Sequence, residues 1–195
     1  MDAEARVLRD AARYLGMAGR ADEALPLMRE AYGLMMAHAA PRHMVKRFPV
    51  EISADALVID GLPPVRSRDL MRLFAGAKEG LALLATLGAP LDALIRRYML
   101  TNPALGAAIG ACGSAYVDVY IDGFLEQEAS ALQAEGLALS PRFSPGYGDA
   151  PLDMQPALLG LLEARRLGVT LTRGMLMLPE KSVTALVAVR GRSAL

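Results

Sequence analysis

The sequence has little of several residue types that build functional sites. Its 195 residues include one cysteine, Cys112, so neither an intramolecular disulfide nor a thiolate zinc cluster is expected. Two histidines, His38 and His43, are too few for a typical histidine-based metal site. Tryptophan is absent and aromatics make up only 5%, whereas there are 11 methionines. The core must therefore consist mainly of Ala, Leu, Val and Met side chains.

An excess of charge of either sign is also missing. Lys and Arg together number 21, and so do Asp and Glu, so no overall field attracts nucleic acid or an anionic membrane. The first ten residues carry alternating charges where a secretory signal needs an apolar segment. The uncharged run 98–117 is interrupted by Thr101–Asn102–Pro103 and is otherwise rich in Ala and Gly. We expect a buried helix there, in a cytoplasmic protein without nucleic-acid or membrane partners.

Hydrophobic periodicity predicts an α+β fold with helices packed around a mainly antiparallel, twisted sheet, because strands and helices fall in separate groups. The predicted helices cover 7–15, 25–36, 67–74, a segment from Pro90, a segment from Pro103, and 158–162. The predicted strands cover 44–52, 56–59, 81–87, 169–172, 175–178 and 183–189, the last two joined as a hairpin by 179–181. Length favours one domain over 1–195, with parts that divide at about residue 100.

The long helix predicted from Asn102 and Pro103 begins with small residues on one side. Asn102 and Pro103 are typical of the N-cap and the first residue of a helix. Gly106, Gly110 and Gly113 follow at spacings that place them near one face. We expect another backbone to approach this helix closely, which places it in the middle of the fold. Close approach of a ligand would look the same in the sequence.

Further along the same helix, three carboxylates recur every four residues. Asp118, Asp122 and Glu126 therefore share one face. Two interpretations stay open. The stripe is either a solvated face, or a face on which one carboxylate turns inward and pairs with a cation, such as Arg142 or a ligand ammonium.

The segment 141–149, PRFSPGYGD, interrupts the regular structure and is the best local candidate for a binding site. Pro145–Gly146 predicts a turn with glycine at positive φ. Such a loop presents free backbone groups, and Arg142 adds a guanidinium that suits a carboxylate. Tyr147 adds a ring that can lie against a flat ligand. A surface ion pair of Arg142 is the alternative. The chain carries no P-loop, dinucleotide fingerprint or nucleophile elbow.

Two C-terminal blocks resemble the reactivation domain of cobalamin-dependent methionine synthase. RFSPGYGD, from Arg142 to Asp149, is similar to the Arg-x-x-x-Gly-Tyr motif of that family. LGVTLTRGMLMLPEKSVTALVAV, from Leu167 to Val189, is similar to its closing strands. The earlier blocks RYLGMAGR, VKRFPVEI and LLATLG resemble compact stand-alone forms of this domain, which would make about 101–195 the part that carries the motif.

The resemblance implies binding of S-adenosylmethionine and methylation of cobalamin that has decayed to the cob(II) state, with an electron from a flavodoxin-type reductant. It assigns cofactor contacts to Arg142, Gly146 and Tyr147, and backbone contacts to Val187 and Ala188. Asp122 or Asp118 would match an acidic residue on the preceding helix. Cobalamin would come only through a partner, a corrinoid methionine synthase that lacks its own activation domain. The chain would be at most one component of a methyltransferase system.

The family pattern and this sequence differ after Tyr147. The full-length enzyme continues as Tyr-Pro-Ala-Cys-Pro, whereas Gly148–Asp149–Ala150–Pro151 follows here. An alternative is therefore a non-catalytic interaction module that docks on a corrinoid protein without binding S-adenosylmethionine. A methyltransferase with a different acceptor is a third reading, and the missing glycine-rich fingerprint excludes its common doubly wound type.

Overall fold

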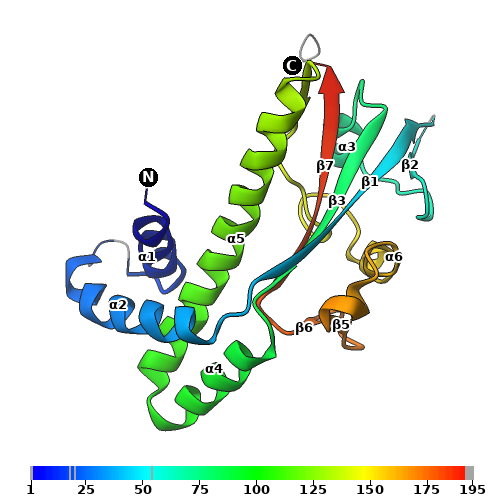
Figure 1. Cartoon of the computed structure of the whole chain (residues 1–195). Coiled ribbons are helices and arrows are strands. Elements are labelled where there is room, and N and C mark those ends of the chain that lie inside the picture. Colours follow the sequence, from blue (N-terminus) through cyan, green and yellow to red (C-terminus); the bar gives the residue numbers. More distant parts are fainter. Residues whose placement is uncertain (1, 18, 20, 54, 192–195) are drawn as a thin grey trace.

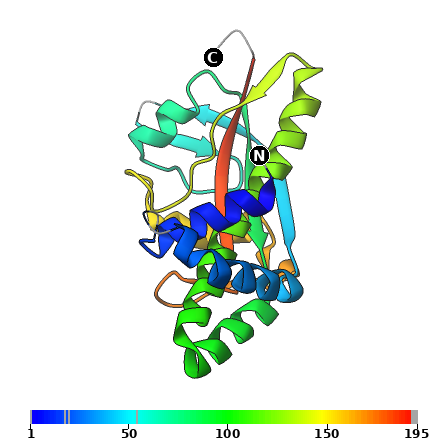
Figure 2. The ribbon, with the colours of Figure 1, turned by 90° about the vertical axis from the view of Figure 1, so that its left-hand side faces the viewer.

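The computed structural model describes residues 2–17, 19, 21–53 and 55–191, and it has the predicted α+β architecture. Helices cover one face of a twisted sheet, and shorter elements and loops cover the other (Figure 1 and Figure 2). The helices are α1 (Ala3–Tyr14), α2 (Ala21–His38), α3 (Arg68–Leu73), α4 (Ala89–Thr101), α5 (Pro103–Gln133) and α6 (Gln155–Leu161), with the 3₁₀ turns η2 (Leu152–Met154) and η3 (Ala164–Leu167). The strands are β1 (Arg42–Ile52), β2 (Leu57–Ile59), β3 (Glu79–Thr86), β4 (Leu137–Leu139), β5 (Thr170–Leu171), β6 (Met177–Leu178) and β7 (Ser182–Gly191).

The main sheet has the order β2-β1-β3-β7-β4, and each neighbouring pair is antiparallel. The central strands β3 and β7 are buried on both faces. In β3, Leu81 and Leu83 pack into the helical core, whereas Ala82 and Leu84 pack into the core of the opposite face. A strand covered on both sides needs apolar side chains at successive positions. This requirement explains why the sequence of β3 is a continuous apolar run.

The predicted hairpin through 179–181 is wrong. The short strand β6 pairs with β5 in a separate two-stranded sheet, and β7 pairs with β3 and β4. Burial gives the physical reason: residues 184–189 of β7 are buried, so this strand needs neighbours that shield it on both sides. The two residues of β6 cannot supply such a neighbour, whereas β3 pairs with β7 from Ser182 to Val189.

Helix α5 begins and packs as its sequence predicts. Asn102 caps it, because the side-chain oxygen accepts a hydrogen bond from the backbone N–H of Leu105 at 3.2 Å. At Gly106, an added Cβ would lie 2.7 Å from the backbone nitrogen of Met99, so α4 and α5 touch at this glycine. Close approach of another backbone is therefore confirmed there. The helix packs against α1, α2 and α4 as the centre of the helical layer.

The most apolar part of α5 also holds the single cysteine. Cys112 is fully buried, and burial raises the pKa of its thiol to about 12. Among the described residues, α5 is long and apolar enough to cross a membrane by length and composition alone. Of its most apolar stretch of 18 residues, 56% is buried inside the fold.

The opposite face of the sheet is covered by α3, α6, both 3₁₀ turns and the β5-β6 pair. Phe48, Phe74 and Leu158 lie in its core, each at most 2% exposed. Ser67 caps α3 as predicted, because its hydroxyl oxygen accepts from the backbone N–H of Leu70 at 3.0 Å. The long loop 140–151 crosses from the end of β4 to this face and carries Arg142, Gly146 and Tyr147.

Candidate functional site

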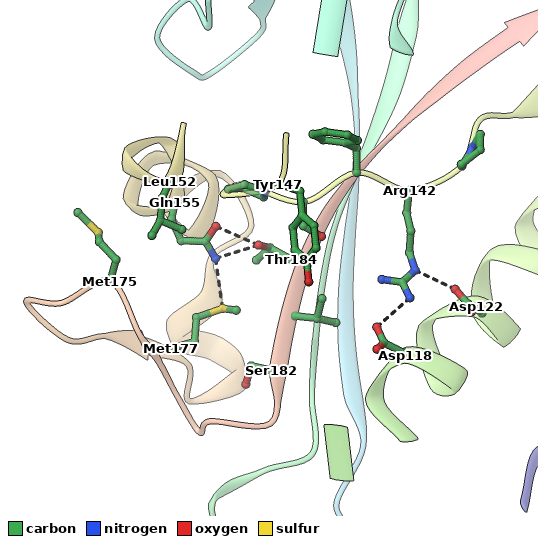
Figure 3. Close-up of a pocket in the computed structure, with 15 residues that line it drawn as sticks. Asp118, Asp122, Arg142, Tyr147, Leu152, Gln155, Met175, Met177, Ser182 and Thr184 are labelled. Atoms are coloured by element: carbon green, nitrogen blue, oxygen red, sulfur yellow. Dashed lines mark hydrogen bonds and ion pairs between the residues drawn. The ribbon is translucent and has the colours of Figure 1, made fainter. Parts of the chain in front are cut away.

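A cavity of about 720 Å³ lies beside β7, between α5 on one side and α6 with the β5-β6 pair on the other (Figure 3). Its volume falls within the range of about 300–1,000 Å³ that small-molecule sites occupy. The lining comes from Asp118 and Asp122 of α5, residues 141–145 and Tyr147 of the loop, Leu152 and Gln155, Met175 and Met177, and residues 182–184 of β7.

The cavity exists because β7 extends beyond the elements that pair with its outer edge. Strand β4 pairs with β7 only from Val189 to Gly191. The loop then continues the pairing, since Phe143 and Leu186 exchange backbone hydrogen bonds of 2.9 and 2.8 Å. Residues 182–184 lie past this bridge and line the cavity. The loop and the strand edge therefore form two of its walls.

Arg142 is held between two carboxylates of α5. Its Nε donates to Asp122 Oδ1 and its Nη2 donates to Asp118 Oδ1, both at 2.8 Å. The four-residue spacing of the aspartates places both on the helix face that meets the loop. The predicted inward pairing with Arg142 is thus confirmed for these two residues, and the solvated face is wrong for them. Glu126, one turn further, is exposed.

Electrostatics keep Arg142 charged although its side chain is only 25% exposed. Burial opposes the charge, but Asp118 and Asp122 more than offset this cost, so the pKa of the guanidinium rises above its usual value. The third guanidinium nitrogen, Nη1, has no hydrogen-bond partner among the described residues, and Figure 3 shows it directed toward the cavity. Arg142 therefore keeps donors for an anionic group in the cavity.

Gly146 and Tyr147 shape the mouth of the cavity. Gly146 has φ +87°, so the predicted turn with glycine at positive φ is confirmed. Its backbone N–H donates to the carbonyl of Ala150 at 3.0 Å, which closes a tight loop around Tyr147. Tyr147 lines the cavity while remaining 70% exposed, so its ring lies at the surface end. Gly146 bends the loop and does not line the cavity itself.

Val187 and Ala188 lie outside the cavity, in contrast to the backbone role that the resemblance assigns to them. Both are fully buried in the centre of β7, where Val187 pairs with Leu81 of β3. The backbone N–H of Ala188 donates to the Ser140 hydroxyl at 2.9 Å. The part of β7 that reaches the cavity is residues 182–184, three to six positions earlier.

The wall opposite Arg142 contains a buried polar pair that the sequence analysis misses. Gln155 and Thr184 are 3% and 2% exposed, and they exchange side-chain hydrogen bonds of 2.8 and 3.0 Å. Met177 adds a sulfur 3.3 Å from the Gln155 amide nitrogen. In the sequence, Gln155 is a single polar residue at the start of an apolar helix, and Thr184 is one threonine in an apolar strand. Neither carries a local signal of its position.

In the segment after Tyr147, Asp149 anchors the loop to α3. Its carboxylate accepts hydrogen bonds from the Ser67 hydroxyl at 2.5 Å and from the backbone N–H groups of Arg68 and Asp69 at 2.9 and 3.1 Å. The Ser67 hydroxyl and the Asp69 N–H lower the pKa of Asp149 to about 2. Asp149 thus holds the loop in place and does not line the cavity.

Among the described residues, no group of three or more His, Cys, Asp or Glu side chains is arranged to hold a metal ion. What the cavity offers is a charged end, formed by Arg142 with Asp118 and Asp122, and a mixed polar and apolar end, formed by Gln155, Thr184 and the methionines. This arrangement suits binding and orientation of a small zwitterion.

Comparison with known proteins gives a likeness of fold. No family model matches the chain, and no curated protein matches its sequence. Among solved structures, the chain is similar to the crystal structure of the MetH reactivation domain bound to AdoHcy, with a TM-score of 0.65 and 18% sequence identity. The match covers 86% of this chain and 66% of the other, so the chain spans just under two thirds of that structure. The fold predicted from the motif resemblance is thereby confirmed.

Proposed function

We propose that the chain binds S-adenosylmethionine in the cavity beside Arg142 and supports the reductive methylation of cob(II)alamin on a separate protein. The partner in this proposal is a corrinoid methionine synthase without an activation domain of its own. The observation that carries the proposal is the guanidinium held between two aspartates at a cavity. That site lies on a fold similar to a reactivation domain that was solved with AdoHcy.

The charged end of the cavity matches the amino-acid end of the ligand. S-adenosylmethionine carries a carboxylate, an ammonium and a sulfonium. The free Nη1 of Arg142 is placed to donate to the carboxylate, and an arginine fork is well suited to that group. Asp118 and Asp122 line the same cavity and complement the positive ammonium. Together these three side chains carry one net negative charge, which complements the net positive charge of the ligand.

The remaining lining matches the nucleoside end. Tyr147 offers a ring face at the cavity mouth, against which an adenine can lie. Gln155 and Thr184 offer amide and hydroxyl groups, and Met175 and Met177 offer adaptable apolar contact. Because Tyr147 is largely exposed, the cavity is reached from the surface, where an acceptor on a second protein can approach.

The chain's own residues bind and orient in this proposal. When bound, S-adenosylmethionine supplies the methyl group, and a flavodoxin-type reductant supplies the electron. No side chain of the cavity has to act as a nucleophile or a base, which agrees with a lining that contains no activated nucleophile. The contribution of the chain is to hold the donor at a fixed place for the acceptor.

Calorimetry with S-adenosylmethionine and AdoHcy tests the proposal. The wild type should bind both, and Arg142→Ala should weaken binding about 10-fold to 100-fold, because a hydrogen bond to a charged group is worth about 1.5–3 kcal/mol. Arg166→Ala removes an exposed arginine that pairs with Glu163, away from the cavity, and should bind as the wild type does. Absence of heat in the wild type would overturn the proposal. Methylation of cob(II)alamin, followed by its absorption spectrum, tests the second step with partner and reductant present.

One observation favours a second candidate function. Two nitrogens of Arg142 already have carboxylate partners, as in a structural ion pair. The chain would then be an interaction module that docks on a corrinoid protein without binding S-adenosylmethionine. This alternative predicts no heat with either ligand, together with capture of a purified corrinoid methionine synthase that Arg142→Ala leaves unchanged.

A further inference from the structure

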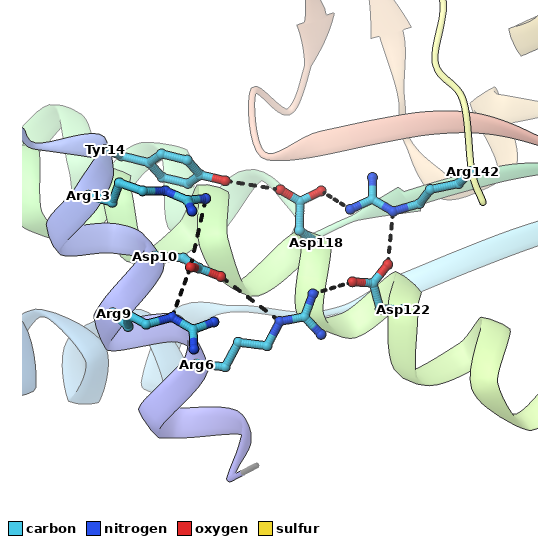
Figure 4. Close-up of polar contacts among 8 residues, drawn as sticks. All are labelled: Arg6, Arg9, Asp10, Arg13, Tyr14, Asp118, Asp122 and Arg142. Carbon is cyan, nitrogen blue, oxygen red and sulfur yellow. Dashed lines mark hydrogen bonds and ion pairs between the residues drawn. The ribbon is translucent and has the colours of Figure 1, made fainter. Parts of the chain in front are cut away.

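The two aspartates that hold Arg142 have a second set of partners on α1, which lies on the far side of them (Figure 4). Asp122 uses Oδ1 for Arg142 and Oδ2 for the guanidinium of Arg6. Asp118 uses Oδ1 for Arg142 and Oδ2 for the hydroxyl of Tyr14, at 3.4 Å. Each carboxylate is therefore fixed at both oxygens, once by the site loop and once by the first helix.

Helix α1 is well placed to hold these contacts steady. Val7 and Ala11 are fully buried in the core that α1 shares with α5. Asp10 lies one turn after Arg6, and its carboxylate is 3.9 Å from the Arg6 Nε. This ion pair within α1 also helps to orient the Arg6 guanidinium. The Arg6 side chain is 34% exposed, and the Asp122 side chain is 23% exposed. Their ion pair is thus partly withdrawn from water, where charges interact more strongly than at an open surface.

The charges of the four central groups cancel. Arg6 and Arg142 contribute two positive charges, and Asp118 and Asp122 contribute two negative ones. Tyr14 adds a neutral donor, because burial and the nearby Asp118 raise the pKa of its hydroxyl. Without Arg6, the groups beside the cavity would carry one net negative charge. S-adenosylmethionine carries one more positive charge than AdoHcy. The positive charge of Arg6 should therefore weaken the binding of S-adenosylmethionine more than the binding of AdoHcy.

We infer that α1 is part of the ligand site: Arg6 and Tyr14 are positioning residues that orient Asp118 and Asp122 toward Arg142, and Arg6 sets the preference between the sulfonium donor and its demethylated product. This inference rests on the proposed function for its ligands. Its structural half, the link from α1 to Arg142, does not depend on any ligand.

The structural half is tested without ligand by following the Nε–H signal of Arg142 in ¹H–¹⁵N spectra. Arg6→Gln should shift this signal and speed its exchange with water, because Asp122 loses the partner that directs it. Arg166→Gln removes the same charge from an exposed ion pair with Glu163 and should leave the signal in place. An Arg142 signal that is identical in wild type and Arg6→Gln would overturn the inference, whatever the ligand results.

The ligand half is tested by the ratio of the dissociation constants for S-adenosylmethionine and AdoHcy. Arg6→Gln should shift this ratio about threefold to fivefold in favour of S-adenosylmethionine, the size expected for one partly screened charge. Arg6→Lys keeps the charge and should restore the wild-type ratio. Tyr14→Phe should weaken both ligands about twofold without changing the ratio, because it removes a long hydrogen bond and no charge.

The two failures are distinguishable. A wild type that binds neither ligand would remove the proposed function and the ligand half of the inference, while the Arg142 signal still decides the structural half. A wild type that binds both ligands, with a ratio that Arg6→Gln does not change, would overturn the ligand half and leave the proposed function standing.

Discussion

On the helical face of the main sheet, α5 packs with α1, α2 and α4 over small and branched apolar side chains such as Ile109, Ala108 and Ala185. On the opposite face, short helices, the β5-β6 pair and a long loop cover the sheet, and the cavity opens beside them. The first cover is regular and tightly packed, and the second is irregular and supplies most of the cavity lining. Substitutions of buried side chains on the helical face should therefore change stability, and substitutions of the exposed side chains that line the cavity on the loop side should change binding.

The largest expected effect is a cavity in the helical core. Ile109 is fully buried on α5, so Ile109→Ala should lower the free energy of unfolding by about 2–5 kcal/mol, measured by urea denaturation. Leu152→Ala, on the loop side and 46% exposed in the wild type, is the matched control and should cost far less. Equal losses in the two variants would contradict the division between the faces.

A smaller effect is expected where α4 and α5 touch. Gly106→Ala would place a Cβ 2.7 Å from the backbone of Met99, so one helix must move, at a cost of about 1–3 kcal/mol. At Gly110, one turn later, the nearest atom to an added Cβ is 4.0 Å away. Gly110→Ala should therefore be neutral or slightly stabilising, because alanine is the better helix former. Thermal unfolding of both variants measures the contrast.

The contribution of Asp149, which anchors the loop to α3, to the stability of the fold should depend on pH. The pKa of Asp149 lies below the value of about 3.9 that an unfolded chain has, so its charged form stabilises the fold. This contribution is complete above about pH 4 and is lost as the pH falls toward about 2. The difference in melting temperature between wild type and Asp149→Asn should therefore be largest at neutral pH and shrink in acid. Asp55→Asn, at an exposed ion pair, should show little difference at either pH.

The smallest effect on stability, and a clear one on binding, is expected at Tyr147. The side chain is 70% exposed, so Tyr147→Ala should change the free energy of unfolding by no more than about 0.5 kcal/mol. Loss of the ring should weaken S-adenosylmethionine about threefold to tenfold, the range of one aromatic contact. Calorimetry with the ligand and urea denaturation on the same preparation separate the two quantities. Unchanged affinity would place the adenine elsewhere.

Local signals are enough to predict most elements of this fold. Ser67 and Asn102 each accept a hydrogen bond from the backbone N–H three residues later. Such caps depend on only a few neighbouring residues, so the local sequence predicts them. The continuous apolar run of β3 likewise predicts a strand buried on both faces. The local sequence does not predict which strand pairs with β7, because Ser182 pairs with Thr86, 96 positions earlier in the chain. The nearer strand β6 was therefore the wrong partner.

The site divides in the same way. Arg142, Gly146 and Tyr147 stand together in one short motif, and the spacing of Asp118 and Asp122 predicts a shared face, so sequence reasoning reaches all of them. Gln155, Thr184 and the two residues of α1 reach the site only through the fold, and each is an ordinary polar residue in its own segment. Val187 and Ala188 were assigned from the motif alone, and the register of β7 places them in the core.

The loop that forms the cavity wall also completes the sheet. The backbone of Ser140 donates to Ala188, and Phe143 exchanges two hydrogen bonds with Leu186, so the loop occupies the outer side of an apolar strand. An uncovered strand of this kind is a template on which other chains assemble and aggregate. The loop must therefore keep both its contacts to the ligand and its hydrogen bonds to β7. Variants that loosen the loop should precipitate even where their ligand contacts are intact.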